Sequence, residues 1–281
     1  MIGNHKKAMD HEKTKKYIIL SLIPGFGAVS QMRLIEICEG IEGCFLFSFD
    51  ELMRRDLSFD AVSRLGARRI ERFCSMRFSR EIIENAELII DDCANKNIYV
   101  ITREDDLYPD RFKPIIDMPV TLYIKGELSI NERIQSVGVV GARRCSQKGK
   151  NDAISVTEKE VENGSAIISG MAKGIDSYAH TAALNNHGYT IAVLGNGPDI
   201  CYPSEHKKLY TEIERRGCII SEHPPGTKPK AYSFPRRNRL IAALSDLVYV
   251  IDVGRNSGTA STVSFCEKYK RPVRMIDPHF F

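Results

Sequence analysis

The sequence predicts an α/β fold, with a mostly parallel sheet covered by helices on both faces and a small helical domain before it. From Ile98 onward, apolar runs of strand length alternate with polar segments of helix length. Near-continuous apolar strands in such an alternation are typical of a parallel sheet buried on both faces. Before Ile98 the apolar residues recur at near-helical spacing instead. The 281 residues, 43% hydrophobic and 27% charged, are enough for one large and one small domain.

The first part of the chain divides into a leader and a helical domain. Residues 1–14 carry lysines but no apolar segment of the kind found in a secretory signal, and we expect a flexible leader. Residues 15–87 are expected to form a small domain of the helix–hairpin–helix or SAM-like kind. In it the Pro24–Gly27 turn separates two apolar, helix-like stretches. Such a turn can hold a phosphate or simply join two packed helices, and packing is the simpler explanation. The stretch from Arg64 to Arg69 is a weaker candidate for a second turn of this kind.

Residues 88–281 are expected to form the α/β domain. The predicted strands are Ile98–Thr102, Thr121–Lys125, Val137–Gly141, Ala166–Ser169, Thr190–Leu194, Cys218–Ser221, Leu247–Val253 and Val273–Ile276. The predicted helices are Gln147–Asn163, Ile175–His187, Ser204–Arg216, Arg236–Ser245 and Thr259–Lys268.

Composition excludes several classes of protein. No apolar run approaches the eighteen or so residues that span a bilayer, so we expect no membrane segment. The eight cysteines are scattered, without a CxxC pair or a Cys/His cluster at metal spacing, which favours reduced thiols, a cytoplasmic location and no metal. The net charge of +4 is too small to indicate a nucleic-acid partner by itself.

Four turns that leave predicted strands carry the functional signal. They begin at Gly141, Ser169, Gly195 and Gly254, and each joins a strand to a helix through Gly, Ser or Thr residues. In an open parallel sheet such turns share the carboxyl edge, where ligands bind. Backbone N–H groups and a helix N-terminus there make an anion site. One turn alone would be weak evidence, since any α/β domain needs glycines at such corners.

The pattern of these turns favours an extended polyanion over one nucleotide. None fits GxxxxGK[ST], and none fits GxGxxG with an acidic residue twenty positions on. We therefore expect no cofactor. The segment 228–239, KPKAYSFPRRNR, holds five basic and two aromatic residues and no acidic one, and it falls on the same edge. Tyr232 and Phe234 could stack on bases while the arginines follow phosphates, although core packing explains Phe234 equally well.

Long motifs in this sequence resemble those of the DprA/Smf family. Segment 169–180, SGMAKGIDSYAH, resembles the family signature SG-x-A-x-GID-x-x-AH, and 190–195, TIAVLG, is followed by the Tyr-Pro pair at 202–203. Segments 221–226, SEHPPG, and 234–245, FPRRNRLIAALS, resemble two further motifs, with SGT at 257–259 in the place of SG-[ST]. Upstream, 106–109 and 118–123 resemble the approach to the family core. The similarity runs from about Ile98 to Val273.

The resemblance implies a Rossmann-like domain that binds single-stranded DNA, forms homodimers and helps to load the RecA recombinase in recombination or natural transformation. It places Arg143 on backbone phosphate, Ser169, Gly170 and Lys173 in a second phosphate site, and Arg237 and Asn238 in the same groove. Turns, basic segment and resemblance together predict the following DNA contacts: Gly141, Arg143, Arg144, Ser169, Gly170, Lys173, Asn196, Phe234, Arg236, Arg237, Asn238, Arg239, Ser257, Gly258 and Thr259.

Two rival functions use the same turns. Rossmann-like enzymes that process nucleoside monophosphates carry a PGGxGTxxE pattern, whereas 256–263 lacks the acidic residue at that spacing. Asp176 and His180 are four residues apart on one predicted helix and could imitate a catalytic pair, but a capping carboxylate and a hydrogen-bonded histidine explain them as well. We expect no catalysis. A sensor of a small nucleotide remains the third reading.

The sequence departs from the family pattern at its C-terminal end. Members commonly continue past the last strand into a Pro-Gly corner and a Gly-x-Asn-x-Leu-Ile segment, whereas here Met275–Phe281 ends the chain, without a winged-helix domain. Residues 263–265 are also larger than the family pattern. We expect any differences from the family at the last sheet edge and at partner surfaces, not in the DNA groove.

Overall fold

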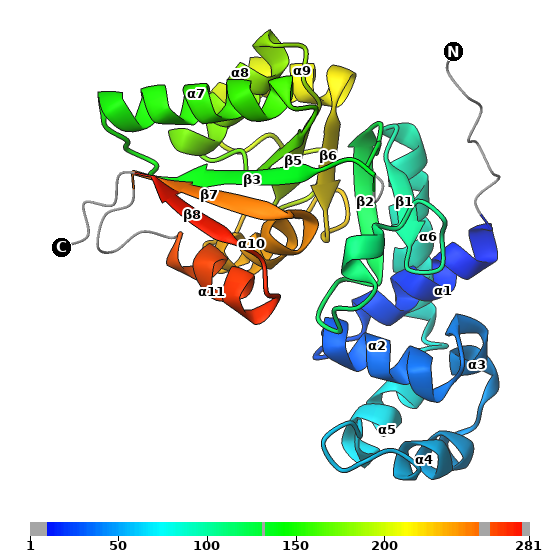
Figure 1. The fold of residues 1–281 in the computed structure, drawn as a ribbon. Coiled ribbons are helices and arrows are strands. Elements are labelled where there is room, and N and C mark those ends of the chain that lie inside the picture. The colour runs from blue at the N-terminus through cyan, green and yellow to red at the C-terminus, as the bar shows by residue number, and fades with distance from the viewer. Residues whose placement is uncertain (1–9, 131–132, 253–258, 277–281) are drawn as a thin grey trace. The chain divides into compact units, whose positions relative to one another are not determined.

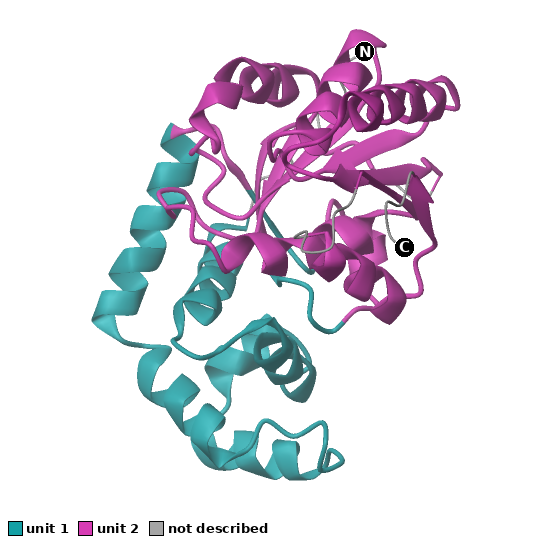
Figure 2. Ribbon diagram, turned by 90° about the vertical axis from the view of Figure 1, so that its left-hand side faces the viewer, with its two compact units in different colours: residues 1–95, 100–105, 116–121 teal, residues 96–99, 106–115, 122–281 magenta. Residues whose placement is uncertain are grey.

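The computed structural model describes residues 10–130, 133–252 and 259–276. The chain divides into two compact units, coloured separately in Figure 2. Unit 1 comprises residues 1–95, 100–105 and 116–121, and unit 2 comprises residues 96–99, 106–115 and 122–281.

Unit 1 is mainly helical. Its helices are α1 (His11–Leu22), α2 (Ala28–Ile37), α3 (Ile41–Leu46), α4 (Phe49–Leu57), α5 (Ala67–Met76) and α6 (Arg80–Asn95). The helix α1 begins at His11, inside the predicted leader, because the Asp10 side chain accepts a hydrogen bond from Lys13 N and caps the first turn. The predicted boundary at residue 87 falls within α6, which continues to Asn95. Tyr17, Leu20, Leu52, Ile70 and Phe73 are fully buried in this unit.

An eight-stranded sheet has the order β1-β2-β6-β5-β4-β3-β7-β8. The strands are β1 (Tyr99–Thr102), β2 (Thr121–Gly126), β3 (Ser136–Gly141), β4 (Ala166–Ser169), β5 (Thr190–Leu194), β6 (Cys218–Ser221), β7 (Leu247–Ile251) and β8 (Val273–Ile276). The pairs from β6 through β8 are parallel, with Val137 opposite Ile167 and Leu247, whereas β2 runs antiparallel to β6. The predicted α/β fold with a mostly parallel sheet is confirmed.

Helices cover both faces of this sheet (Figure 1). One face carries α7 (Gln147–Glu162), α8 (Ile175–Asn185) and α9 (Lys207–Arg216), the last preceded by a short 3-10 turn, η2 (Ser204–His206). The other face carries α10 (Ser233–Leu244) and α11 (Ala260–Lys268). Val137, Val139 and Ile167 of the strands pack with Ile175 and Ala179 of α8 in a fully buried cluster. This apolar packing fixes the strand ends from which the functional turns leave.

The strand order places a topological switch point between β3 and β7. From β3 the chain passes through α7 to β4 on one side, and from β7 it passes through α11 to β8 on the other. The two connections diverge over opposite faces, and in doubly wound sheets ligands commonly bind beyond the carboxyl ends of two such strands. The Gly141 turn therefore borders the position where doubly wound sheets bind their ligands.

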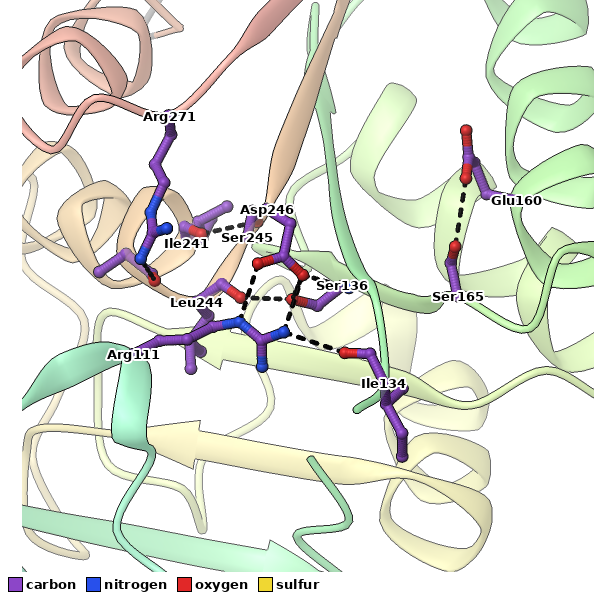
Figure 3. Close-up of polar contacts among 11 residues, drawn as sticks. Arg111, Ile134, Ser136, Glu160, Ser165, Ile241, Leu244, Ser245, Asp246 and Arg271 are labelled. Atoms are coloured by element: carbon purple, nitrogen blue, oxygen red, sulfur yellow. Dashed lines mark hydrogen bonds and ion pairs between the residues drawn. The ribbon is translucent and has the colours of Figure 1, made fainter. Parts of the chain in front are cut away.

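The opposite, amino edge of the sheet is closed by polar contacts (Figure 3). Arg111, in the 3-10 turn η1 (Asp110–Phe112), donates Nε to Asp246 Oδ1 at 3.0 Å and Nη2 to Asp246 Oδ2 at 2.8 Å. Its Nη2 also donates to the carbonyl of Ile134 at 3.0 Å. Asp246 in turn accepts from Ser136 N at the start of β3. These bonds attach the 106–115 segment to the amino edge of the sheet.

Candidate nucleic-acid interface

The turn after β3 presents two arginines to solvent. Gly141 allows close packing at the strand end, since a Cβ there would lie 2.6 Å from Ile175 Cγ1. The chain then exposes Arg143 and Arg144 before α7 begins. Ser146 caps that helix by accepting from Gly149 N at 2.9 Å. The two cations are thus carried on a turn whose two ends are fixed by packing and capping.

An aromatic stack adjoins the first of these arginines. The Phe234 ring lies 5.3 Å from that of Tyr202, centroid to centroid, at 28° between planes. The Arg143 guanidinium lies 5.9 Å from the Phe234 centroid on this edge. We call Arg143, Phe234 and Tyr202 the aromatic stack. Phe234 is half-buried, whereas Tyr202 is 46% exposed, so an aromatic surface is open to solvent.

Tyr202 was not among the predicted contacts. It follows β5 in the Tyr-Pro pair, and its position after a strand that ends on the functional edge was the available signal. Tyr232, which we expected to be able to stack on bases, is 65% exposed and lies beside Lys230, whose Nζ is 5.9 Å from its ring centroid.

In the turn after β4, only the lysine faces solvent. Ser169 is buried and donates its hydroxyl to Val139 O at 2.6 Å. The N–H of Gly170 donates to Asp176 Oδ2 at 3.1 Å. The predicted phosphate site at Ser169 and Gly170 is therefore corrected, because both residues are buried and hydrogen-bonded within the protein. Lys173 is exposed, and its Nζ lies 2.7 Å from Glu205 Oε1.

Arg237 lies inside the domain, contrary to the predicted groove contact. Its Nη1 donates to Gly170 O at 2.6 Å and also to Val193 O, so it joins the ends of β4 and β5. A Cβ at Gly170 would overlap this guanidinium, which explains the glycine there. Burial lowers the pKa of Arg237 to about 10, opposed by the nearby Asp176 carboxylate. Arg237 supports the turns that carry the exposed cations.

Arg239 is the second buried arginine of the basic segment and also corrects the prediction. Its Nη1 and Nη2 donate to Glu222 Oε1 at 3.1 Å and Oε2 at 2.6 Å, a bidentate pair. Burial alone would raise the pKa of Glu222, but Arg239 and Arg236 outweigh it and lower the pKa. Arg236 is half-exposed, with Nε 4.0 Å from Glu222 Oε1, and it remains available on the surface.

The other predicted contacts have different environments. Asn196 is buried and donates to Gly197 O and Ile200 O at 2.9 and 2.7 Å, so it holds its own turn instead of facing a ligand. Asn238 is half-buried, and its Nδ2 donates to Ser261 Oγ at 2.9 Å. Thr259 is buried just before α11. Ser257 and Gly258 lie outside the described residues.

Asp176 and His180 are not placed for catalysis. Asp176 is buried and accepts from the N–H groups of Gly170 and Ala172, and burial raises the pKa of its carboxyl. His180 is fully buried, with Nδ1 2.7 Å from Thr190 Oγ1, and burial lowers its pKa to about 3. Neither side chain is open to a substrate. Across residues 10–130, 133–252 and 259–276, no three His, Cys, Asp or Glu side chains are grouped to hold a metal ion.

The surface that remains combines cations with an aromatic face. Arg143, Arg144, Lys173 and Arg236 are exposed on turns or helix starts that follow β3, β4 and β6. In a comparison with known families, residues 99–281 match the model of DNA recombination-mediator protein A. The chain belongs to the DprA/Smf family.

Relatives of this family resemble the chain over different lengths. It is 43% identical over 164 residues to the DNA processing protein DprA of Streptococcus pneumoniae, covering 58% of this chain and 56% of that protein. It is 32% identical over 268 residues to Protein Smf of Synechocystis, covering 94% of this chain and 65% of the relative. The chain thus spans between about half and two thirds of these DprA/Smf proteins.

Solved DprA structures share its fold. The crystal structure of DprA from S. pneumoniae superposes with a TM-score of 0.70 at 29% identity, covering 96% of this chain and 86% of that one. A DprA structure from Helicobacter pylori, described for its single-stranded DNA binding mode, superposes with a TM-score of 0.58 at 30% identity, covering 66% and 84%.

Proposed function

We propose that this protein binds single-stranded DNA along the carboxyl edge of its sheet. The observation that carries the proposal is the aromatic stack, in which the exposed Tyr202 ring lies against Phe234 and the cation Arg143 lies near the same Phe234 ring. The H. pylori relative, described as a single-stranded DNA binder, supports the same assignment.

The chemistry of the edge favours an unpaired strand. Backbone phosphates are attracted to Arg143, Arg144, Lys173 and Arg236, whose exposed guanidinium and ammonium groups release counterions when they bind. The Tyr202 ring offers a stacking surface to a base, and only an unpaired base can present its face to it. Duplex DNA can place its phosphates on these cations, but its paired bases cannot stack on the Tyr202 ring.

Membership of the DprA/Smf family supports a wider role. We propose that the bound strand is passed to the RecA recombinase, in recombination or natural transformation, and that the protein acts in the cytoplasm as a homodimer without a cofactor. Among the described residues, no helix has the length and apolarity to cross a bilayer.

The test is a binding titration by fluorescence anisotropy on a labelled oligo-dT and on a duplex of equal length. We expect tighter binding to the single strand and an affinity that falls steeply with salt. Tyr202→Ala is expected to lose about 1–3 kcal/mol on the single strand, the value of one base–aromatic stack, and much less on the duplex.

Tyr202→Phe is the matched control, because it keeps the ring and removes only the hydroxyl, and it should bind as the wild type does. Equal affinity for both DNAs, or an equal loss on both in Tyr202→Ala, would refute single-strand recognition by this ring.

A further inference from the structure

A cavity in unit 1 is lined by arginines that the proposed function does not use. It has a volume of about 570 Å³ and lies between the turn after α1 and the start of α5. Its lining residues are Gly25, Leu65, Gly66, Ala67, Arg68, Arg69 and Arg72. Both turns that the sequence singled out in the helical region therefore border one cavity.

Two of the three arginines donate hydrogen bonds to carbonyl groups. Arg72 Nη1 donates to Pro24 O at 3.1 Å, and Arg69 Nη1 donates to Leu65 O at 3.1 Å. Gly25 has a φ of +74°, and a Cβ there would lie 2.6 Å from Arg72 Nη1. The glycine thus leaves the space in which this guanidinium reaches the other turn.

These three cations carry uncompensated charge. Arg68, Arg69 and Arg72 are all exposed, and none of them has a carboxylate within ion-pair distance among the residues described. The Asp56 carboxylate, which contacts the backbone of the cavity lining, is buried and accepts from Leu65 N at 2.7 Å and Gly66 N at 3.0 Å. The Asp56 carboxylate is therefore hydrogen-bonded to the backbone and forms no ion pair with the arginines. The segment 64–72 holds four arginines and one glutamate.

We propose that this arginine-lined cavity is a second nucleic-acid site, which binds the phosphodiester backbone without reading bases. Guanidinium groups match phosphate oxygens in charge and in fork geometry. The lining offers only the arginines and small or apolar residues, and no exposed aromatic ring on which a base could stack. The same contacts are therefore available to the backbone of a single strand or of a duplex.

The experiment compares two double variants of the full chain with equal loss of charge. Arg68→Ala/Arg69→Ala removes two cations from the cavity, and Arg54→Ala/Arg80→Ala removes two exposed cations of the same unit that do not line it. Binding of labelled oligo-dT and of the matching duplex is measured against salt concentration. We expect the cavity variant to lower the slope of log K against log salt by about 1.8 on duplex or about 1.4 on single strand.

The control variant should leave both slopes unchanged, and Arg68→Lys/Arg69→Lys should keep most of the wild-type slope because it retains the charges. A slope in the cavity variant equal to that of the control on both DNAs would overturn the proposal. A lowered slope on one DNA alone identifies which backbone the cavity takes.

A combination of variants distinguishes DNA binding at the cavity from DNA binding at the sheet edge. The cavity variant is repeated in a background of Arg143→Ala/Lys173→Ala. If the sheet edge does not bind DNA, that background behaves as the wild type while the cavity variant still lowers the slope. If the cavity does not bind DNA, only the sheet-edge variant has an effect.

Discussion

At the scale of single residues, Lys173 already has a partner that imitates phosphate. Glu205 Oε1 lies 2.7 Å from its Nζ, and both side chains are 56% exposed. A DNA phosphate that binds Lys173 must displace this carboxylate. Exposed ion pairs contribute about 0.2–1 kcal/mol, so the displacement reduces affinity only modestly.

Glu205→Gln is therefore expected to raise the affinity for single-stranded DNA about two- to fivefold at low salt. The gain comes from the released Lys173 charge and should vanish in a Lys173→Ala background, measured by anisotropy titration. A gain that persists without Lys173 would mean that Glu205 acts by general repulsion of DNA.

His180 makes stability depend on pH. Its folded-state pKa of about 3 lies below the ordinary value of 6.5 because burial disfavours the charged ring. Below about pH 6.5 the His180 ring is therefore protonated in the unfolded chain but stays neutral in the folded protein. The free energy of unfolding falls as the pH drops from there toward 3. Between pH 7 and 5 we expect a loss of about 2 kcal/mol in urea unfolding.

The matched variant is His180→Asn, which cannot be protonated. Its free energy of unfolding should change less between pH 7 and 5, whatever its absolute value. An equally steep decline in the variant would assign the effect to other groups.

At the scale of elements, the helix α10 buries some arginines of the basic segment 228–239 and leaves another on the surface. Arg237 shares a face with Leu240, Ile241 and Leu244, at spacings of three, four and seven residues, and that face is buried. Arg236 is one position out of phase and lies on the surface. A count of charges in the sequence treats the arginines as equal, whereas the helical period separates Arg236 from Arg237, and Arg239 is buried through its pair with Glu222. The helix predicted from Arg236 already carried this phase, but the partner that buries Arg239, Glu222, comes from a distant part of the sequence.

Loss of the Arg239–Glu222 pair should destabilise the α10 region strongly. Arg239→Ala leaves Glu222 buried without its bidentate partner, and we expect a loss of about 3–5 kcal/mol in chemical denaturation. Arg236→Ala is the control, since its half-exposed guanidinium is 4.0 Å from the same carboxylate, and it should cost less than about 1 kcal/mol.

Acid should have a related effect. Because the folded-state pKa of Glu222 is lowered, the pair stabilises the protein above the unfolded-state pKa of about 4.3, and this contribution is lost as the pH falls through the lower, folded-state value. If Arg239→Ala and Arg236→Ala lose similar unfolding free energy in chemical denaturation, the Arg239–Glu222 pair is not the source of stability.

The sheet was more predictable than the site. Apolar strands such as Ala166–Ser169 and Thr190–Leu194 have the predicted bounds because burial on both faces leaves a continuous apolar run. The predicted strand from Leu247 to Val253 ends at Ile251, and the helix predicted from Ser204 divides into η2 and α9. Burial of Ser169, Asn196 and Arg237 depends on side chains brought together by the fold, which local spacing does not reveal.

At the scale of the whole molecule, the chain passes between the units more than once. Residues 96–99 and 106–115 belong to unit 2, whereas 100–105 and 116–121 belong to unit 1. Arg111 attaches the 106–115 segment to the amino edge of the sheet through Asp246 and Ile134 (Figure 3). Unit 2 is therefore not one continuous stretch of sequence, and a truncation at Leu122 would remove part of it.

Arg111→Ala is expected to cost about 1.5–3 kcal/mol of unfolding free energy, the range for hydrogen bonds to charged groups. Lys113→Ala, in the same segment but with an exposed ion pair to Asp110, should cost less than about 1 kcal/mol. Urea unfolding of both variants checks the difference, and equal costs would show that the Asp246 contact does not hold this segment.

If the sheet edge binds DNA as proposed, the buried arginines have a consequence for the rate of association. Arg237 joins the ends of β4 and β5, and Arg239 fixes Glu222 just after β6, so these strand ends are braced from within the protein. A surface whose supports are preorganised loses little conformational entropy when a ligand arrives. Most of the conformational entropy lost on binding is then lost by the flexible DNA. The association rate constant is therefore set by diffusion and electrostatic attraction, and not by rearrangement of the protein.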